Sequence, residues 1–193
     1  MTTNNKNEAY LEAIFGPMFS GKTSYIVEVY KQCLFCSIPV IVINHSIDNR
    51  YDDNLLATHD KVMIPCVKTD KLLELSSELL TNKVILINEG QFFPDLYEFV
   101  INMLALNKQI YVCGLDGDYK RNKFGQILDI IPLCDRVVKL SSLCGICKDG
   151  TRGIFSKRIS SELEQTVVGN DNYIPVCRKC YETQNNNISK IIY

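Results

Sequence analysis

The stretch GPMFSGKT, residues 16–23, has the spacing G-x-x-x-x-G-K-T of a phosphate-binding loop. Gly16 and Gly21 allow the backbone to turn so that successive N–H groups point at a β-phosphate. The Lys22 ammonium is expected to reach the β- and γ-phosphates, and the Thr23 hydroxyl to ligate Mg²⁺. We therefore predict that a nucleotide is bound by the eight residues Gly16, Pro17, Met18, Phe19, Ser20, Gly21, Lys22 and Thr23.

A second polar group follows the apolar run VILI in VILINEGQFF, residues 84–93. P-loop enzymes usually carry a magnesium-ordering aspartate at this point, but this chain has Asn88. Asn88 adds no charge, so we expect Asp48, which follows another apolar run, to supply the missing carboxylate. The same reasoning predicts that Asn88→Asp raises activity at low magnesium. Glu89 is one residue further on and is the candidate general base for an attacking hydroxyl, and Gln91 is expected to contribute to nucleotide binding.

Two C-x-x-C pairs lie near the C-terminus, in CGIC and CRKC. Their thiolates, Cys144, Cys147, Cys177 and Cys180, can surround a tetrahedral ion, most simply Zn²⁺. Four protein ligands leave no open position for a water molecule, so a structural zinc is expected. A third pair, Cys33 and Cys36, has no complementary partner, and we favour apolar thiols there over a redox site. For His45 and His59, local hydrogen bonding is favoured over ligand binding.

Alternating strands and helices must position these groups in the first two thirds of the chain. Apolar runs predict strands at 12–15, 38–44, 83–88 and 109–115, and amphipathic patterns predict helices at 23–33, 69–80 and 94–106. Strands that are apolar throughout indicate a parallel sheet covered on both faces. The expected fold class is thus α/β, a P-loop sheet of the RecA-like type with helices on both faces, plus a small zinc-stapled lobe. Residues 1–142 would form the first domain, and residues 143–193 the second, with a frayed tail.

The totals restrict the functional class. The net charge is −1 and the isoelectric point is about 6.1, without the basic surplus that polymeric nucleic acid favours. No apolar run approaches the roughly 20 residues of a membrane span. The N-terminus MTTNNKNEAY has neither a basic nor an apolar signal region, which favours a cytoplasmic location.

Seven blocks of the chain together resemble the zinc-containing thymidine kinases of the cytosolic, bacterial and poxviral type. They are GPMFSGKT, DNRY (48–51), THD (58–60), EGQFFPD (89–95), LDGDYKRNKFG (115–125), VVKLSSLCGIC and PVCRKCY, and they span roughly residues 10–182. The resemblance implies transfer of the γ-phosphate of MgATP to the 5′-hydroxyl of thymidine, with deoxyuridine as a further substrate. It implies that Glu89 deprotonates the hydroxyl and that Arg50 and Arg121 lie near the phosphates.

The same resemblance assigns the nucleoside site. Met18, Leu115 and Tyr119 would line the thymine pocket, and Phe92, an aromatic close to the predicted ligand edge, is a further candidate. The zinc-held loop would correspond to a lasso that closes over the base, with Ser156, Val167, Val168, Gly169 and Tyr173 as candidates. The family also implies a homo-oligomer, with a tetramer favoured, and feedback inhibition by dTTP. Three alternatives remain: a kinase of another nucleoside, a zinc-ribbon P-loop ATPase that binds nucleic acid, and an inactive thymidine-binding protein.

Overall fold

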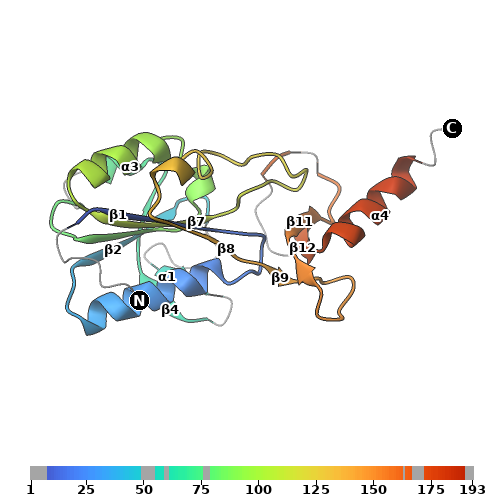
Figure 1. The fold of residues 1–193 in the computed structure, drawn as a ribbon, viewed down its shortest axis with the longest axis horizontal. Helices are drawn as coiled ribbons and strands as arrows, with labels where there is room; N and C mark the ends of the chain where they lie inside the picture. Colours follow the sequence, from blue (N-terminus) through green and yellow to red (C-terminus); the bar gives the residue numbers. More distant parts are fainter. Residues whose placement is uncertain are drawn as a thin grey trace.

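The structure is a computed structural model that describes residues 8–48, 55–58, 61–75, 79–162, 164–166 and 172–189; for 184–189 it describes the backbone only. At its centre lies a six-stranded sheet in which every neighbouring pair is parallel (Figure 1). The strands, in spatial order, are β5 (Val67–Thr69), β2 (Val40–His45), β6 (Val84–Ile87), β7 (Gln109–Gly114), β1 (Tyr10–Phe15) and β8 (Arg136–Lys139). The four predicted strands are confirmed, each within two residues at either end.

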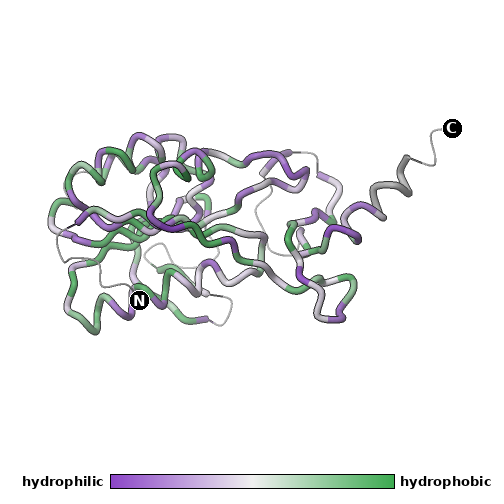
Figure 2. Tube along the Cα trace, viewed as in Figure 1, coloured by the Kyte–Doolittle hydropathy of each residue, from purple (hydrophilic) through white to green (hydrophobic). Residues whose placement is uncertain are grey.

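Helices cover both faces of this sheet, as predicted. Helix α1 (Lys22–Phe35) packs against one face and α3 (Leu96–Ala105) against the other (Figure 1). Side chains alternate across the strands: Leu11 and Ala13 join the core beneath α3, whereas Ile14 joins the core beneath α1. All four residues of β6 are buried, and the strands form the apolar centre in Figure 2. Burial of each large side chain contributes roughly 1.5–3 kcal/mol.

The helix predicted over 69–80 is wrong in its first part. Val67–Thr69 is strand β5, because it pairs with β2 at the edge of the sheet. Thr69 ends the strand, and its hydroxyl accepts a hydrogen bond from the Lys71 N–H at 3.2 Å. A short 3₁₀ helix, η1 (Leu72–Leu75), follows. Further short elements are the hairpin of β3 (Leu55–Ala57) and β4 (Met63–Pro65), and the 3₁₀ helices η2 (Gly90–Phe92) and η3 (Ile131–Leu133).

Two small antiparallel hairpins and a helix make up the C-terminal part, beyond the end of the sheet (Figure 1). The first hairpin pairs β9 (Ser142–Leu143) with β10 (Arg152–Gly153), and the second pairs β11 (Phe155–Arg158) with β12 (Tyr173–Val176). Helix α4 (Arg178–Ser189) follows, so a helix continues to Ser189 where the sequence predicted a frayed tail. In the part of the chain that the structure describes, every helix is too short or too polar to cross a membrane.

Candidate active site

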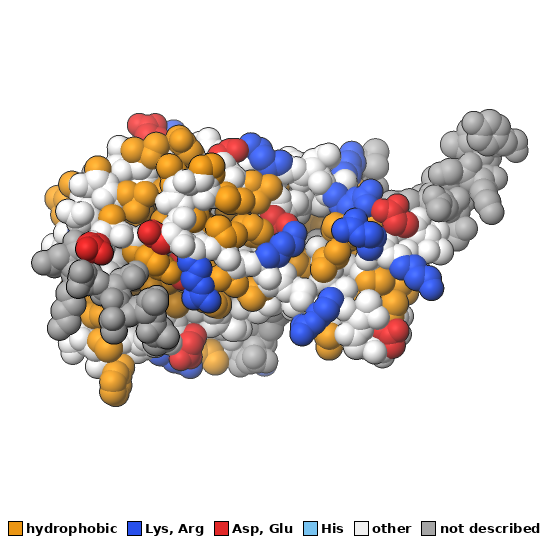
Figure 3. Space-filling view, in the orientation of Figure 1, with side chains coloured by type: hydrophobic (Ala, Val, Ile, Leu, Met, Phe, Trp, Pro, Cys, Tyr) orange, Lys and Arg blue, Asp and Glu red, His pale blue; other side chains and the backbone are white. Residues whose placement is uncertain are grey.

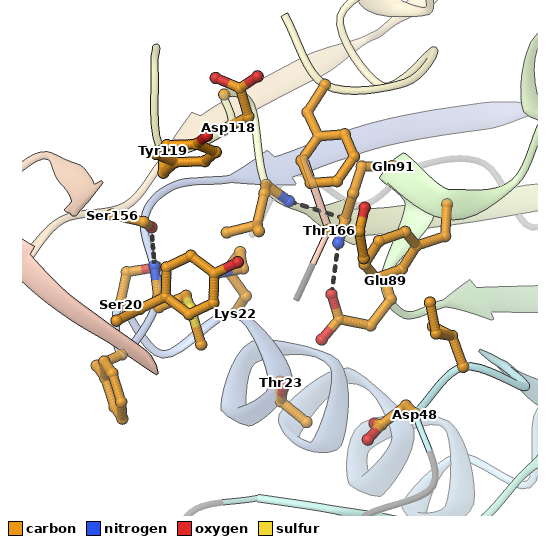
Figure 4. A pocket seen from close by; sticks show the side chains of 18 of the residues that line it. Ser20, Lys22, Thr23, Asp48, Glu89, Gln91, Asp118, Tyr119, Ser156 and Thr166 are labelled. Carbon is orange, nitrogen blue, oxygen red and sulfur yellow. Dashed lines mark hydrogen bonds between the residues drawn. The ribbon is translucent and has the colours of Figure 1, made fainter. Parts of the chain in front are cut away.

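The predicted phosphate-binding loop joins β1 to α1 and lines a cavity at the carboxyl ends of the strands (Figure 4). Gly21 precedes α1 with φ of 87°, a left-handed conformation that glycine adopts without strain. At Gly16 a Cβ atom would lie 2.4 Å from the carbonyl oxygen of Leu140, the residue after β8, so this close approach requires glycine. The Lys22 ammonium donates to the Pro17 carbonyl at 2.7 Å. Met18, Phe19, Ser20, Gly21, Lys22 and Thr23 all line the cavity.

Glu89 leaves the end of β6 in a left-handed conformation, with φ of 55°, and also lines the cavity. The Gln91 amide donates to the Glu89 carboxylate at 2.7 Å and accepts from the Leu115 N–H at 2.9 Å. Gln91 is buried, so its two hydrogen bonds hold it in one orientation. A Cβ atom at Gly114 would lie 2.3 Å from the Gln91 amide oxygen. The Glu89 carboxylate is thereby held toward the phosphate-binding loop (Figure 4).

Asp48 lines the same cavity, but Asn88 lies behind it. The Asn88 amide donates to Asn44 at 2.9 Å and accepts from the Cys113 thiol at 3.1 Å. Asn44 in turn donates to the Asp48 carboxylate at 3.1 Å. Asn88 is only 2% exposed. Both polar atoms of the Asn88 side chain are thus engaged within the protein, and the contribution of Asn88 to nucleotide binding, through a hydrogen bond to a metal-bound water, stays a prediction.

The other side of the cavity combines aromatic and lasso residues. Of the predicted nucleoside residues, five that the structure describes beyond the phosphate-binding loop line it: Phe92, Leu115, Tyr119, Ser156 and Tyr173. Phe92 meets Phe124 edge to face, with ring centroids 5.4 Å apart. The Ser156 hydroxyl accepts from the Met18 N–H at 2.9 Å, which ties strand β11 to the phosphate-binding loop (Figure 4).

Arg158 fixes the lasso next to this cavity. It is only 8% exposed, and its guanidinium donates to the carbonyl oxygens of Glu162, Glu164 and Gln165 and to the Tyr173 hydroxyl. The same guanidinium stacks 3.9 Å from the centroid of the Tyr119 ring. The positive charge of the Arg158 guanidinium is thus stabilised by carbonyl dipoles and by the faces of aromatic rings.

Several site residues were missed from the sequence. Gln165 and Thr166 line the cavity, and the Gln165 amide donates to the Asp118 carboxylate at 3.0 Å. Asp118 also accepts from the N–H groups of Lys120 and Asn122, so it organises the loop after β7. The only available signal was that Asp118 follows an apolar strand. Arg158 and Gln165 had no signal, since their roles depend on contacts across the lasso.

Four predicted site residues, Arg50, Val167, Val168 and Gly169, lie outside the described residues, as does His59. Arg121, expected near the phosphates, instead pairs with Glu182 at 2.6 Å and lies 4.3 Å from the centroid of the Tyr181 ring. Cys33 is buried and Cys36 exposed, both as free thiols. Burial raises the pKa of Cys33 to about 11, which fits an unreactive thiol.

The four predicted metal ligands come together in the C-terminal part. Cys144 and Cys147 lie in the β9–β10 turn, and Cys177 and Cys180 at the start of α4; their sulfur atoms all lie within 4.8 Å of one another. The Cys147 sulfur is 3.2 Å from that of Cys180 and 3.7 Å from that of Cys177. Burial opposes ionisation of Cys144, but hydrogen bonds from the backbone of Cys147 and Cys177 lower its pKa to about 6. This donor set fits a tetrahedral thiophilic ion.

A parallel sheet with a phosphate-binding loop and a carboxylate across the same cavity defines a P-loop phosphotransferase. A sequence model of the family "Thymidine kinase" matches residues 9–181. The thymidine kinase of Yaba monkey tumor virus is 39% identical over 183 residues, covering 94% of this chain and 99% of that protein. Those of Monkeypox virus and Variola virus are 40% and 39% identical, each covering 91% of this chain and 98% of theirs. The chain belongs to the thymidine kinase family.

Proposed function

We propose that this protein is an ATP-dependent thymidine kinase that transfers the γ-phosphoryl group of MgATP to the 5′-hydroxyl of thymidine, giving dTMP and ADP. The observation that carries the proposal is the cavity that the Glu89 carboxylate and the phosphate-binding loop both line. A hydroxyl placed between them would have a base for its proton and a phosphoryl group to attack. Membership of the family supplies the nucleoside.

Each side chain has a role that its position supports. Backbone N–H groups of residues 19–22 hold the donor phosphates at the start of α1. Lys22 screens charge on the group in transfer, and Glu89, oriented by Gln91, takes the hydroxyl proton. Thr23 and Asp48 offer oxygen atoms to Mg²⁺, which neutralises phosphate charge when bound. Arg50 as a further cation at the phosphates stays a prediction.

The base is read by the lasso. Phe92, Leu115 and Tyr119 provide apolar and stacking surface, while main-chain groups of Val167, Val168 and Gly169 are the predicted partners of the thymine edge. The hydrogen bond from Met18 to Ser156 supports a closed arrangement in which water has little access to the phosphoryl group. Zn²⁺ bound to Cys144, Cys147, Cys177 and Cys180 would be structural and would fix both ends of the lasso.

Other features extend from the resemblance. We propose a cytoplasmic enzyme that recovers nucleosides for DNA synthesis, phosphorylates deoxyuridine as well, is inhibited by dTTP and assembles as a homo-oligomer, with a tetramer favoured. Neither a membrane nor polymeric nucleic acid is a proposed partner. Lys and Arg side chains do gather over the lasso part in Figure 3. Arg121, from the loop after β7, and Arg178, from α4, lie over aromatic rings of this part, which favours a structural role for both cations. The division into domains at residues 142 and 143 also remains our proposal.

A panel of nucleosides tests the assignment. Purified enzyme with MgATP is offered thymidine, deoxyuridine, deoxycytidine, deoxyadenosine and deoxyguanosine, and the products are separated by chromatography. We expect dTMP and dUMP with one ADP formed per nucleotide, and no purine nucleotide. Turnover of a purine nucleoside in preference to thymidine would favour the alternative nucleoside kinase. ATP hydrolysis that needs polynucleotide and yields no dTMP would favour the nucleic-acid-binding ATPase.

A further inference from the structure

A chain of buried hydrogen bonds crosses three neighbouring strands and ends at the cavity. The Cys113 thiol of β7 donates to Asn88 at the end of β6, Asn88 donates to Asn44 of β2, and Asn44 donates to Asp48. The heavy-atom distances are 3.1, 2.9 and 3.1 Å, respectively. Exposure is at most 2% for the first three residues and 9% for Asp48. Asp48 is thus the one member at the cavity surface.

The chemistry of the four groups fixes the direction of this chain. Each carboxamide has one acceptor oxygen and one donor nitrogen, whereas an ionised carboxylate only accepts. Burial raises the pKa of Cys113 to about 12, so the thiol keeps its proton and donates. Water cannot replace a lost partner easily at such buried positions, and a buried orphaned donor or acceptor is costly. Both asparagines are therefore held with their NH₂ groups directed toward Asp48.

Asp48 accepts the last hydrogen bond of this chain, and its carboxylate lies where a nucleotide-bound metal ion would be held. It lines the same end of the cavity as Thr23 and Glu89 (Figure 4). Mg²⁺ prefers oxygen ligands and near-ideal octahedral geometry, so a carboxylate with a fixed orientation serves it better than a mobile one. An outer-shell hydrogen bond that fixes a ligating carboxylate commonly changes metal affinity by 10- to 100-fold.

We propose that Asn44 and Asn88 act as a coupled pair of positioning residues that hold the Asp48 carboxylate for the nucleotide-bound magnesium, without either asparagine contacting the ion. This inference rests on the proposed function, since it assumes a metal–nucleotide complex in the cavity. It reverses the expectation drawn from the sequence for Asn88→Asp. An aspartate at 88 has no NH₂ to donate to Asn44, so Asn44 would turn its own NH₂ toward residue 88 and present its oxygen to Asp48.

The test measures metal binding without turnover. Mn²⁺ serves as a paramagnetic probe for Mg²⁺, and its affinity for the enzyme–ADP complex is measured by electron paramagnetic resonance. The variants are Asn88→Asp, Asp48→Asn and the double variant Asn44→Leu/Asn88→Leu. The double variant removes both amides together, so no asparagine NH₂ is orphaned and folding is preserved better than in either single leucine variant. Thymidine affinity is measured on the same samples.

We expect all three variants to bind Mn²⁺ at least about tenfold more weakly than the wild type, with thymidine affinity within about twofold. Tighter Mn²⁺ binding by Asn88→Asp would overturn the proposal, because it would make position 88 a direct ligand site. Wild-type affinity in the double variant would overturn it as well. If these shifts appear but the wild type makes no dTMP, the proposed function fails and the positioning role stands. If the wild type makes dTMP at a full rate but the variants bind Mn²⁺ as tightly as the wild type, the proposed function stands and the positioning role fails.

Discussion

At the scale of single residues, the proposed catalysis depends on side chains that are held before any ligand arrives. Glu89 receives a hydrogen bond from Gln91, and Gln91 is itself held by the Leu115 N–H. Asp48 is held in a comparable way by Asn44. Glu89 and Asp48 therefore each have a buried amide behind them. Such preorganisation lowers the reorganisation needed when charge moves in the transition state.

His45 makes a prediction about pH. Its ring lies 4.8 Å from that of Phe93, and its Nδ1 accepts from the Ile47 N–H at 3.1 Å. Burial lowers the pKa of His45, with Asp70, Glu89 and Asp95 opposing the shift. Between the lowered pKa and its usual value near 6.5, the unfolded chain binds a proton that the folded protein does not, so stability falls as the pH falls.

Urea unfolding at pH 7.5 and at pH 5.5 measures this effect. The wild type should lose more stability on acidification than His45→Gln, which keeps an acceptor but does not titrate. An equal loss of unfolding free energy in the two proteins would show that protonation of His45 is not the cause of the loss in acid.

At the scale of elements, the sequence was informative wherever a strand was long and apolar. The runs that became β1, β2, β6 and β7 lie in the centre of the sheet, and their burial on both faces produces the uninterrupted apolar pattern. The edge strands β5 and β8 were missed, because they are short and partly exposed. The α-helix predicted over 69–80 began too early, because a pattern of leucines cannot distinguish a 3₁₀ turn from an α-helix.

The residues of the candidate site also differ in how well the sequence predicted them. The phosphate-binding loop, Glu89 and the cysteine pairs were predictable, because their chemistry requires neighbours in the sequence. Asn44, Arg158 and Gln165 were not, because their partners lie on other elements. For the same reason, the sequence gives no sign that Asn44 lies between Asn88 and Asp48.

Arg158 gives the prediction at this scale. The change Arg158→Met keeps an apolar stem against Tyr119 but removes the hydrogen bonds to three lasso carbonyls. Hydrogen bonds of a charged group contribute roughly 1.5–3 kcal/mol each, so we expect the KM for thymidine to rise at least about tenfold. The KM for ATP should stay within about twofold, as the phosphate-binding loop is separate.

Steady-state kinetics with each substrate varied in turn gives the two constants. Arg152→Met is the matched control, because Arg152 is exposed on β10. Equal rises in both constants, or a similar effect in the control, would contradict a specific role for Arg158 in the lasso.

At the scale of the whole molecule, the sheet and the C-terminal part both line one cavity. The sheet supplies the phosphate-binding loop, Asp48 and Glu89, while the C-terminal part supplies Ser156 and Tyr173. Among its described residues, the C-terminal part has only a small apolar cluster of its own, in which the cysteines themselves take part. A unit with so small a core needs another source of stability, such as a bound metal ion.

Metal content and activity should therefore change together. The wild type should hold one zinc ion per chain by elemental analysis, and Cys177→Ser should hold much less, with a lower Tm and a raised KM for thymidine. Cys36→Ser is the control, since Cys36 belongs to a C-x-x-C pair but is an exposed free thiol. A zinc-free wild type with normal activity would contradict the structural role.

The most direct test of the whole account is the rate of dTMP formation in a single turnover, with thymidine and MgATP prebound. Glu89→Gln keeps the size of the side chain and removes the base; Glu98→Gln, on the exposed face of α3, makes the same change away from the cavity. We predict that the Glu89 variant binds both substrates normally and reacts about 10²- to 10⁴-fold more slowly, while the Glu98 variant matches the wild type. A Glu89 variant that retains a tenth or more of the wild-type rate would contradict the role of this carboxylate.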